Sequence, residues 1–93
     1  MNILDFIPKE KTNAISREAL CDFTGYDDRK NRLIISQLRA EGNLICNRGK
    51  GYYIAADLDD IERQYRADKA RAMSILKRLK VMRAILRDAG RRV

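Results

Sequence analysis

Two basic clusters contain the residues of this chain whose types and spacing could do chemistry. The first holds Arg29, Lys30 and Arg32, and the second holds Arg48 and Lys50, each followed by a glycine. Guanidinium groups donate paired hydrogen bonds to phosphate oxygens and to the guanine edge, whereas lysine binds phosphate as a point charge. The two clusters therefore predict an anionic partner, most simply a nucleic acid.

The common catalytic and metal-binding patterns are missing from the sequence. It has no histidine, and its two cysteines, Cys21 and Cys46, form no CxxC pair. No glycine-rich phosphate loop follows a strand pattern, and the carboxylates gather at expected helix starts, where capping explains them. The sequence therefore predicts no enzyme, no cofactor and no metal site, and no small-molecule ligand is evident.

The net charge of +7 is carried by the end of the chain. Residues 1–70 hold 12 basic and 12 acidic side chains, whereas residues 71–93 hold eight basic side chains and one acidic side chain, Asp88. This basic end favours an anionic partner, with a solvated helix face kept soluble by its charge as the alternative.

The composition and hydropathy are typical of one folded domain. Of the 93 residues, 45% are hydrophobic and 35% are charged. No apolar run approaches the roughly 20 residues of a membrane span, and residues 1–11 lack the regions of a signal peptide. We therefore expect a cytoplasmic protein with no membrane partner and with two reduced thiols rather than a disulfide.

The middle of the chain reads as helix, turn and helix. Ser16 is a typical N-cap for a helix reaching about residue 23, and Gly25 suits the turn that follows. Asp27 or Asp28 caps a second helix over about 28–41, which Gly42 would end. One of these two acids could instead bond cytosine N4 or hold an arginine.

A small hairpin and a long helix complete the expected fold. Residues 44–47 and 51–55 read as short strands around a turn at 47–51. Because side chains alternate along a strand, we expect one of Tyr52 and Tyr53 in the core and the other exposed. The predicted fold class is mainly α with a small β-hairpin, a winged helix-turn-helix followed by a long C-terminal helix.

The sequence contains no helix breaker between residue 59 and Gly90, so the last helix would be longer than the diameter of a compact domain. Its apolar residues alternate spacings of four and three, as in a coiled coil. We expect Ile61 and Tyr65 to pack on residues 1–57, the winged-helix domain. The remaining seam of the 58–93 helix would form a homodimer, although the whole stripe could pack on its own core. The expected dimer residues are Ile75, Leu79, Met82 and Leu86.

A set of positions within residues 15–55 resembles the N-terminal DNA-binding domain of the biotin operon repressors. The matched positions are Ile15, Ser16, Leu20, Gly25, Ile35, Leu38, Arg39, Gly42 and 49–52. The chain is still more similar to small winged helix-turn-helix proteins of phages and prophages in Gram-positive bacteria. The features shared with them are the run 13–17, the pair Asp28-Arg29, the run 51–53 and a basic C-terminal helix. The resemblance implies a protein that binds DNA.

Two residues of the second helix depart from the pattern of that family. Asn31 stands where an aliphatic residue is usual on the buried side, and a buried amide needs hydrogen-bond partners. Leu33 falls on the face expected to be polar, where it could form an interaction surface. The first departure predicts either a polar contact in the core or a loosely seated helix.

These features predict a sequence-specific protein that binds duplex DNA and regulates transcription or a phage or other mobile element. We expect Arg29 and Arg32 to contact bases and Lys30 to contact a base or a phosphate. The phosphate and minor-groove contacts would come from Arg17, Arg48 and Lys50. The alternative is a protein-interaction module that uses the winged helix and the amphipathic C-terminal helix.

Overall fold

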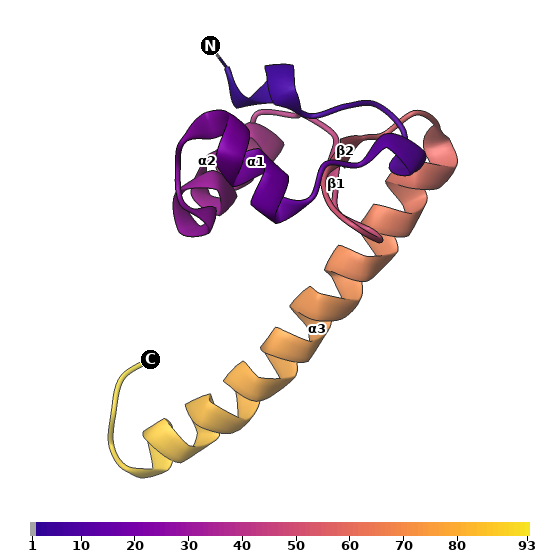
Figure 1. The fold of residues 1–93 in the computed structure, drawn as a ribbon. Helices are drawn as coiled ribbons and strands as arrows, with labels where there is room; N and C mark the ends of the chain where they lie inside the picture. The colour runs from indigo at the N-terminus through magenta and orange to yellow at the C-terminus, as the bar shows by residue number, and fades with distance from the viewer. Residues whose placement is uncertain (1) are drawn as a thin grey trace.

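The computed structural model describes residues 2–93 and is mainly helical, with a two-stranded antiparallel hairpin and a long C-terminal helix (Figure 1). This arrangement confirms the predicted fold class. The elements, in chain order, are the 3-10 helices η1 (Ile3–Phe6) and η2 (Lys11–Asn13), helices α1 (Arg17–Thr24) and α2 (Asp28–Ala40), strands β1 (Ile45–Cys46) and β2 (Tyr53–Ile54), and helix α3 (Leu58–Asp88).

Each α-helix begins at a side chain that accepts a hydrogen bond from its first turn. Ser16 Oγ accepts from the backbone of Ala19 at 3.1 Å, and Asp27 Oδ1 accepts from Lys30 at 2.8 Å. Asp57 caps α3 in the same way. These contacts satisfy backbone donors that a helix start leaves free. They confirm Ser16 as the predicted cap of α1 and select Asp27 over Asp28 as the cap of α2.

The end of α2 is set by Gly42. Its φ of 101° lies in the left-handed region that favours glycine. Its backbone N–H donates to the carbonyl of Arg39, and the next N–H, from Asn43, donates to the carbonyl of Leu38. This pair of bonds closes the helix and turns the chain into β1, as the sequence predicts.

The core lies between α1, α2 and the hairpin. Leu20 of α1 packs with Ile35 and Leu38 of α2 and with Ile45 of β1, and the N-terminal segment covers this cluster. Burial of these apolar side chains holds α1 and α2 at a fixed angle. The helix pair is thereby a rigid support for the charged side chains on its outer surface.

The strands of the hairpin are shorter than predicted, and Cys46 pairs with Tyr53 within them. An isolated bridge between Tyr52 and Ile15, which lies just before α1, extends the pairing. The expectation that one tyrosine is exposed is wrong, because Tyr52 is 5% exposed and Tyr53 is 0% exposed. Tyr52 belongs to the main core, whereas Tyr53 lies on the opposite face with Cys46, which the start of α3 covers. Both faces of this strand are therefore buried.

Helix α3 leaves the hairpin and extends beyond the rest of the molecule (Figure 1). Every residue from Asp68 to Val93 is exposed. Ile61 is half-buried as expected, whereas Tyr65 is 60% exposed and packs on the winged-helix domain only in part, along a pocket that Leu44 also lines. Among the helices of residues 2–93, none combines the length and the apolar character needed to cross a bilayer.

Candidate nucleic-acid interface

The starts of α1 and α2 are joined by one carboxylate that pairs with two arginines. Arg17, the first residue of α1, donates from Nε to Asp28 Oδ1 at 2.9 Å and from Nη2 to the other carboxylate oxygen. Arg32, one turn along α2, places its Nε 3.2 Å from Asp28 Oδ2. Asp28 therefore positions both guanidinium groups and offsets part of their charge.

This pairing shifts the pKa of Asp28 and that of Arg17 in the directions that favour their charged forms. The hydrogen bond from Arg17 lowers the pKa of the Asp28 carboxyl below its ordinary 3.8, and the nearby charges of Arg17 and Arg32 act in the same direction. The same hydrogen bond raises the pKa of Arg17. Of the two adjacent acids, Asp28 thus holds the arginines while Asp27 caps α2.

The first turn of α2 also presents Arg29 and Lys30 to solvent. The ammonium group of Lys30 lies 3.9 Å from the centroid of the Tyr26 ring, a cation–π contact that limits its freedom. Within residues 2–93, no side-chain hydrogen bond or salt bridge engages Arg29. Both cations are therefore accessible to a ligand that approaches the start of α2.

The buried amide of Asn31 locks α1 to α2 beneath these cations. Asn31 is 1% exposed, and its Nδ2 donates to Cys21 Sγ at 3.4 Å. Its Oδ1 lies 3.1 Å from the hydroxyl of Thr24. The polar contact expected at this departure is thus present, and Leu33 is 60% exposed on the outer face, as its position predicts.

The turn of the hairpin, residues 47–51, is the predicted wing, and its base is fixed on two sides. On one side the backbones of Ile15 and Tyr52 exchange hydrogen bonds of 2.9 and 2.8 Å. The approach is so close that a Cβ on Gly51 would meet the carbonyl oxygen of Ile15 at 2.0 Å. On the other side the backbone N–H of Asn47 donates to Gln64 Oε1 of α3 at 3.0 Å. The wing is therefore held between α1 and α3.

One polar depression of about 380 Å³ opens between α1, α2, the wing and α3. Arg17, Arg32 and Lys50 line it, so the structure brings together three of the predicted DNA-binding residues. It does not bring Arg29, Lys30 or Arg48 into this depression. The full lining is Arg17, Arg32, Asn47, Gly49, Lys50, Gly51, Tyr52 and Arg71.

Sequence reasoning missed two residues of this region, Gln64 and Arg71. Arg71 is the first residue of the basic end, but composition alone gives no sign of which α3 side chains face the wing. Gln64 and Arg71 are seven residues apart, about two helical turns, so they share a face. The contact between Asn47 and Gln64 fixes that face toward the wing, and this depends on tertiary packing.

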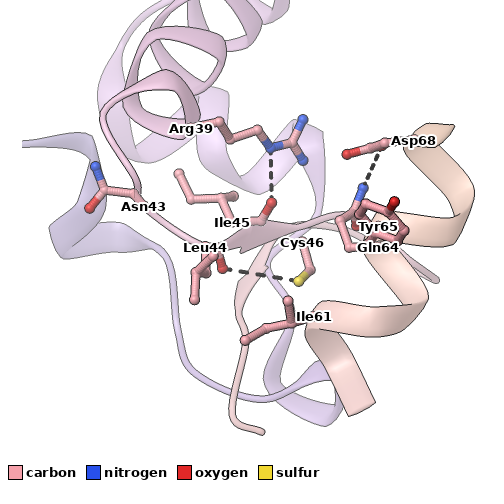
Figure 2. A pocket seen from close by; sticks show the side chains of 9 residues that line it. All are labelled: Arg39, Asn43, Leu44, Ile45, Cys46, Ile61, Gln64, Tyr65 and Asp68. Carbon is pink, nitrogen blue, oxygen red and sulfur yellow. Dashed lines mark hydrogen bonds between the residues drawn. The ribbon is translucent and has the colours of Figure 1, made fainter. Parts of the chain in front are cut away.

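A second, smaller pocket of about 220 Å³ lies between the end of α2, β1 and α3 (Figure 2). Arg39 borders it and donates from Nε to the carbonyl of Ile45 at 2.9 Å. Gln64 donates to Asp68 Oδ1 at 2.9 Å on the opposite side. Leu44, Ile61 and Tyr65 supply apolar lining. The Arg39 bond ties α2 to β1 and the Gln64 bond lies within α3, so at this pocket α3 meets the hairpin through the apolar lining.

Within the part of the chain that the structure describes, no group of three or more His, Cys, Asp or Glu side chains could hold a metal ion. Cys21 and Cys46 are both free thiols. Comparison of the chain with protein-family models, with curated proteins and with solved structures gives no match.

Proposed function

We propose that the protein binds duplex DNA sequence-specifically, with α2 in the major groove and the wing on phosphates or in the minor groove. It would act in the cytoplasm as a regulator of transcription or of a phage or other mobile element. The observation that carries this proposal is the convergence of Arg17, Arg32 and Lys50, from α1, α2 and the wing, on one depression. The resemblance to winged helix-turn-helix proteins supports it.

The hydrogen-bonding capacity of each cation suggests its role. Arg29 has all its donors free for the edge of a guanine. Arg32 uses Nε on Asp28, which leaves both Nη groups for a base or a phosphate. Arg17 has two of its nitrogens on Asp28 and would contribute a phosphate contact with the rest. Arg48 and Lys50 of the wing would contact phosphates.

The proposal includes a homodimer that forms through the outer half of α3. Ile75, Leu79, Met82 and Leu86 follow the four-and-three spacing of coiled-coil core positions. Their exposed fractions are 40, 45, 49 and 36%, so no other part of residues 2–93 covers this seam. A symmetric pair of α3 helices would bury it and place two α2 helices on one duplex.

The roles of Arg29 and Lys50 can be separated by their effects on DNA binding. We expect Arg29→Ala to relax base preference at one position, because a guanidinium fork on a base edge discriminates by about 1–3 kcal/mol. We expect Lys50→Ala to weaken binding to all duplexes alike and to reduce the salt slope by about one. Fluorescence anisotropy on matched and mismatched duplexes at several salt concentrations measures both effects.

Each variant serves as the control for the other, since each removes one exposed cation. If both variants weaken every duplex by the same small factor, Arg29 does not read a base. If neither changes binding, the assigned surface is wrong.

The second candidate function is that of a protein-interaction module. Three exposed apolar side chains near the turn between α1 and α2 support it, namely Phe23 at 63%, Tyr26 at 42% and Leu33 at 60%. An adaptor would bind a partner protein through this surface or through α3. The same anisotropy assay discriminates, because an adaptor would show no salt-sensitive duplex binding.

A further inference from the structure

Arg71 brings a fourth cation, and a fourth element of the fold, to the depression at the wing. It lies on α3, outside the helix-turn-helix, yet it lines the same space as Arg17, Arg32 and Lys50. Helix α3 is fixed at this point, because Gln64, two turns earlier on the same face, accepts the backbone N–H of Asn47. The face of α3 on which Arg71 lies is therefore turned toward the wing by a contact made two turns earlier.

The charges around this depression are unbalanced. Within residues 2–93, no carboxylate lines it, and the acid that pairs with Arg17 and Arg32, Asp28, lies outside the lining. Among these residues, neither Lys50 nor Arg71 forms a salt bridge. Like charges gathered in a concave surface repel one another and raise the local potential, so an anion bound there would be stabilised.

The neutral part of the lining also suits an oxyanion. Tyr52 is 5% exposed, and its burial raises the pKa of its hydroxyl, which therefore stays protonated as a potential donor. The wing glycines allow close packing at the edge of the depression, since a Cβ at Gly49 would meet the Lys11 side chain at 2.9 Å and one at Gly51 would meet the Ile15 carbonyl. Guanidinium forks pair well with the oxygens of a phosphate group.

We propose that this depression is a binding site for a DNA backbone phosphate and that Arg71 makes α3 part of the DNA-binding surface. The inference rests on the proposed function. It deepens that function by adding a phosphate contact from the same helix that carries the dimer seam. DNA binding then orients α3, and dimerisation in turn orients the wing and Arg71 on the duplex.

The test compares Arg71→Gln with Lys69→Gln in the full chain. Both substitutions remove one exposed cation from the same turn of α3, but the two side chains point about 200° apart around the helix. We expect Arg71→Gln to weaken duplex binding and to reduce the slope of log K against log salt by about 0.9. Lys69→Gln should leave the slope of the wild-type protein unchanged. Equal slopes for all three proteins, with duplex binding intact, would overturn the site and leave the proposed function standing.

A second measurement detects the site without DNA. In a titration with inorganic phosphate followed by amide chemical shifts, the amides of residues 49–52 and of Arg71 should move in the wild-type protein and in Lys69→Gln. In Arg71→Gln these shifts should be lost. If the wild-type protein binds no duplex but shows these shifts, the proposed function fails and the site takes free phosphate groups instead of DNA. If no shifts occur at these amides, the anion site itself is overturned.

Discussion

At the scale of single residues, Asp28 determines how much positive charge the helix pair offers to a ligand. Its carboxylate accepts hydrogen bonds from Arg17 and lies 3.2 Å from Arg32. The three side chains together carry one net positive charge, although two arginines are present. Asp28 therefore fixes the positions of the two guanidinium groups but weakens their attraction for an anionic ligand.

The Asp28→Asn variant tests this balance through its pH dependence. Because the pKa of Asp28 is lowered in the folded protein, its ion pairs stabilise the fold above the ordinary pKa of 3.8, and this stabilisation is lost as the pH falls through the lowered folded-state pKa. We expect wild-type protein to melt at a higher temperature than Asp28→Asn at pH 6. The difference should shrink as the pH falls below 3.8.

Thermal unfolding of both proteins between about pH 2 and 6 measures the effect. This range extends about two pH units on either side of an ordinary carboxyl pKa. A difference in melting temperature that stays constant over this range would contradict the assigned ion pairs. The same variant should bind duplex DNA more tightly at low salt, since one negative charge is removed near the phosphates.

At the scale of elements, local signals predict the helices well and the hairpin less well. Ser16, Asp27 and Gly42 act on the backbone within a few residues, so α1 and α2 have the bounds that the sequence predicts, to within one or two residues. The burial of both Tyr52 and Tyr53 depends on α3 covering the second face of the hairpin, and alternation along a strand cannot predict it.

The residues of the candidate site also fall into a group that the sequence predicts and a group that depends on tertiary packing. Arg17, Arg32 and Lys50 belong to elements whose order is readable from the sequence, so their convergence could be expected. Arg71 could not be placed, because the face of α3 toward the wing is selected by the contact of Gln64 with Asn47. The high exposure of Tyr65 was also not predictable, since its spacing places it on the apolar seam of α3 but does not tell where the core ends.

The position of the wing depends on the small size of Gly51. The backbone at residues 51 and 52 approaches Ile15 so closely that a larger residue at position 51 would not fit. A methyl group at residue 51 would overlap the carbonyl oxygen of Ile15 at 2.0 Å. We expect Gly51→Ala to lower stability by about 1–3 kcal/mol, the usual cost of overpacking. For a domain of this size that is a fall in melting temperature of at least about 4 °C.

Lys50→Ala is the matched control for this prediction, since it changes the adjacent wing residue without a backbone overlap. Its melting temperature should stay close to that of the wild-type protein, although its DNA binding weakens. An unchanged melting temperature for Gly51→Ala would show that the wing does not rest against Ile15 as described.

At the scale of the whole molecule, α3 makes the monomer unusually extended. The radius of gyration is 16.9 Å, whereas a compact chain of this length has about 12 Å. The molecule measures 50 × 31 × 22 Å, and its long dimension follows the direction of α3 (Figure 1). The proposed homodimer would cover the exposed apolar seam of this extended helix with a second copy of the chain.

Leu79→Glu tests the dimer seam, and Val81→Glu is its control. Leu79 lies on the seam, whereas Val81 is 61% exposed and lies about 200° around the helix from Leu79. We expect wild-type protein and Val81→Glu to sediment as dimers and Leu79→Glu as a monomer, because a carboxylate on the seam would be desolvated without a partner. Wild-type protein that sediments as a monomer at every concentration would contradict the homodimer.

The most direct test of the central claim is selection of bound duplexes from a random DNA library with the full-length protein, followed by sequencing. We expect an enriched inverted repeat with half-sites about one helical turn apart, because a symmetric dimer would place one α2 helix in each of two successive major grooves. Failure to retain any duplex at low salt would contradict DNA binding and would favour the protein-interaction module.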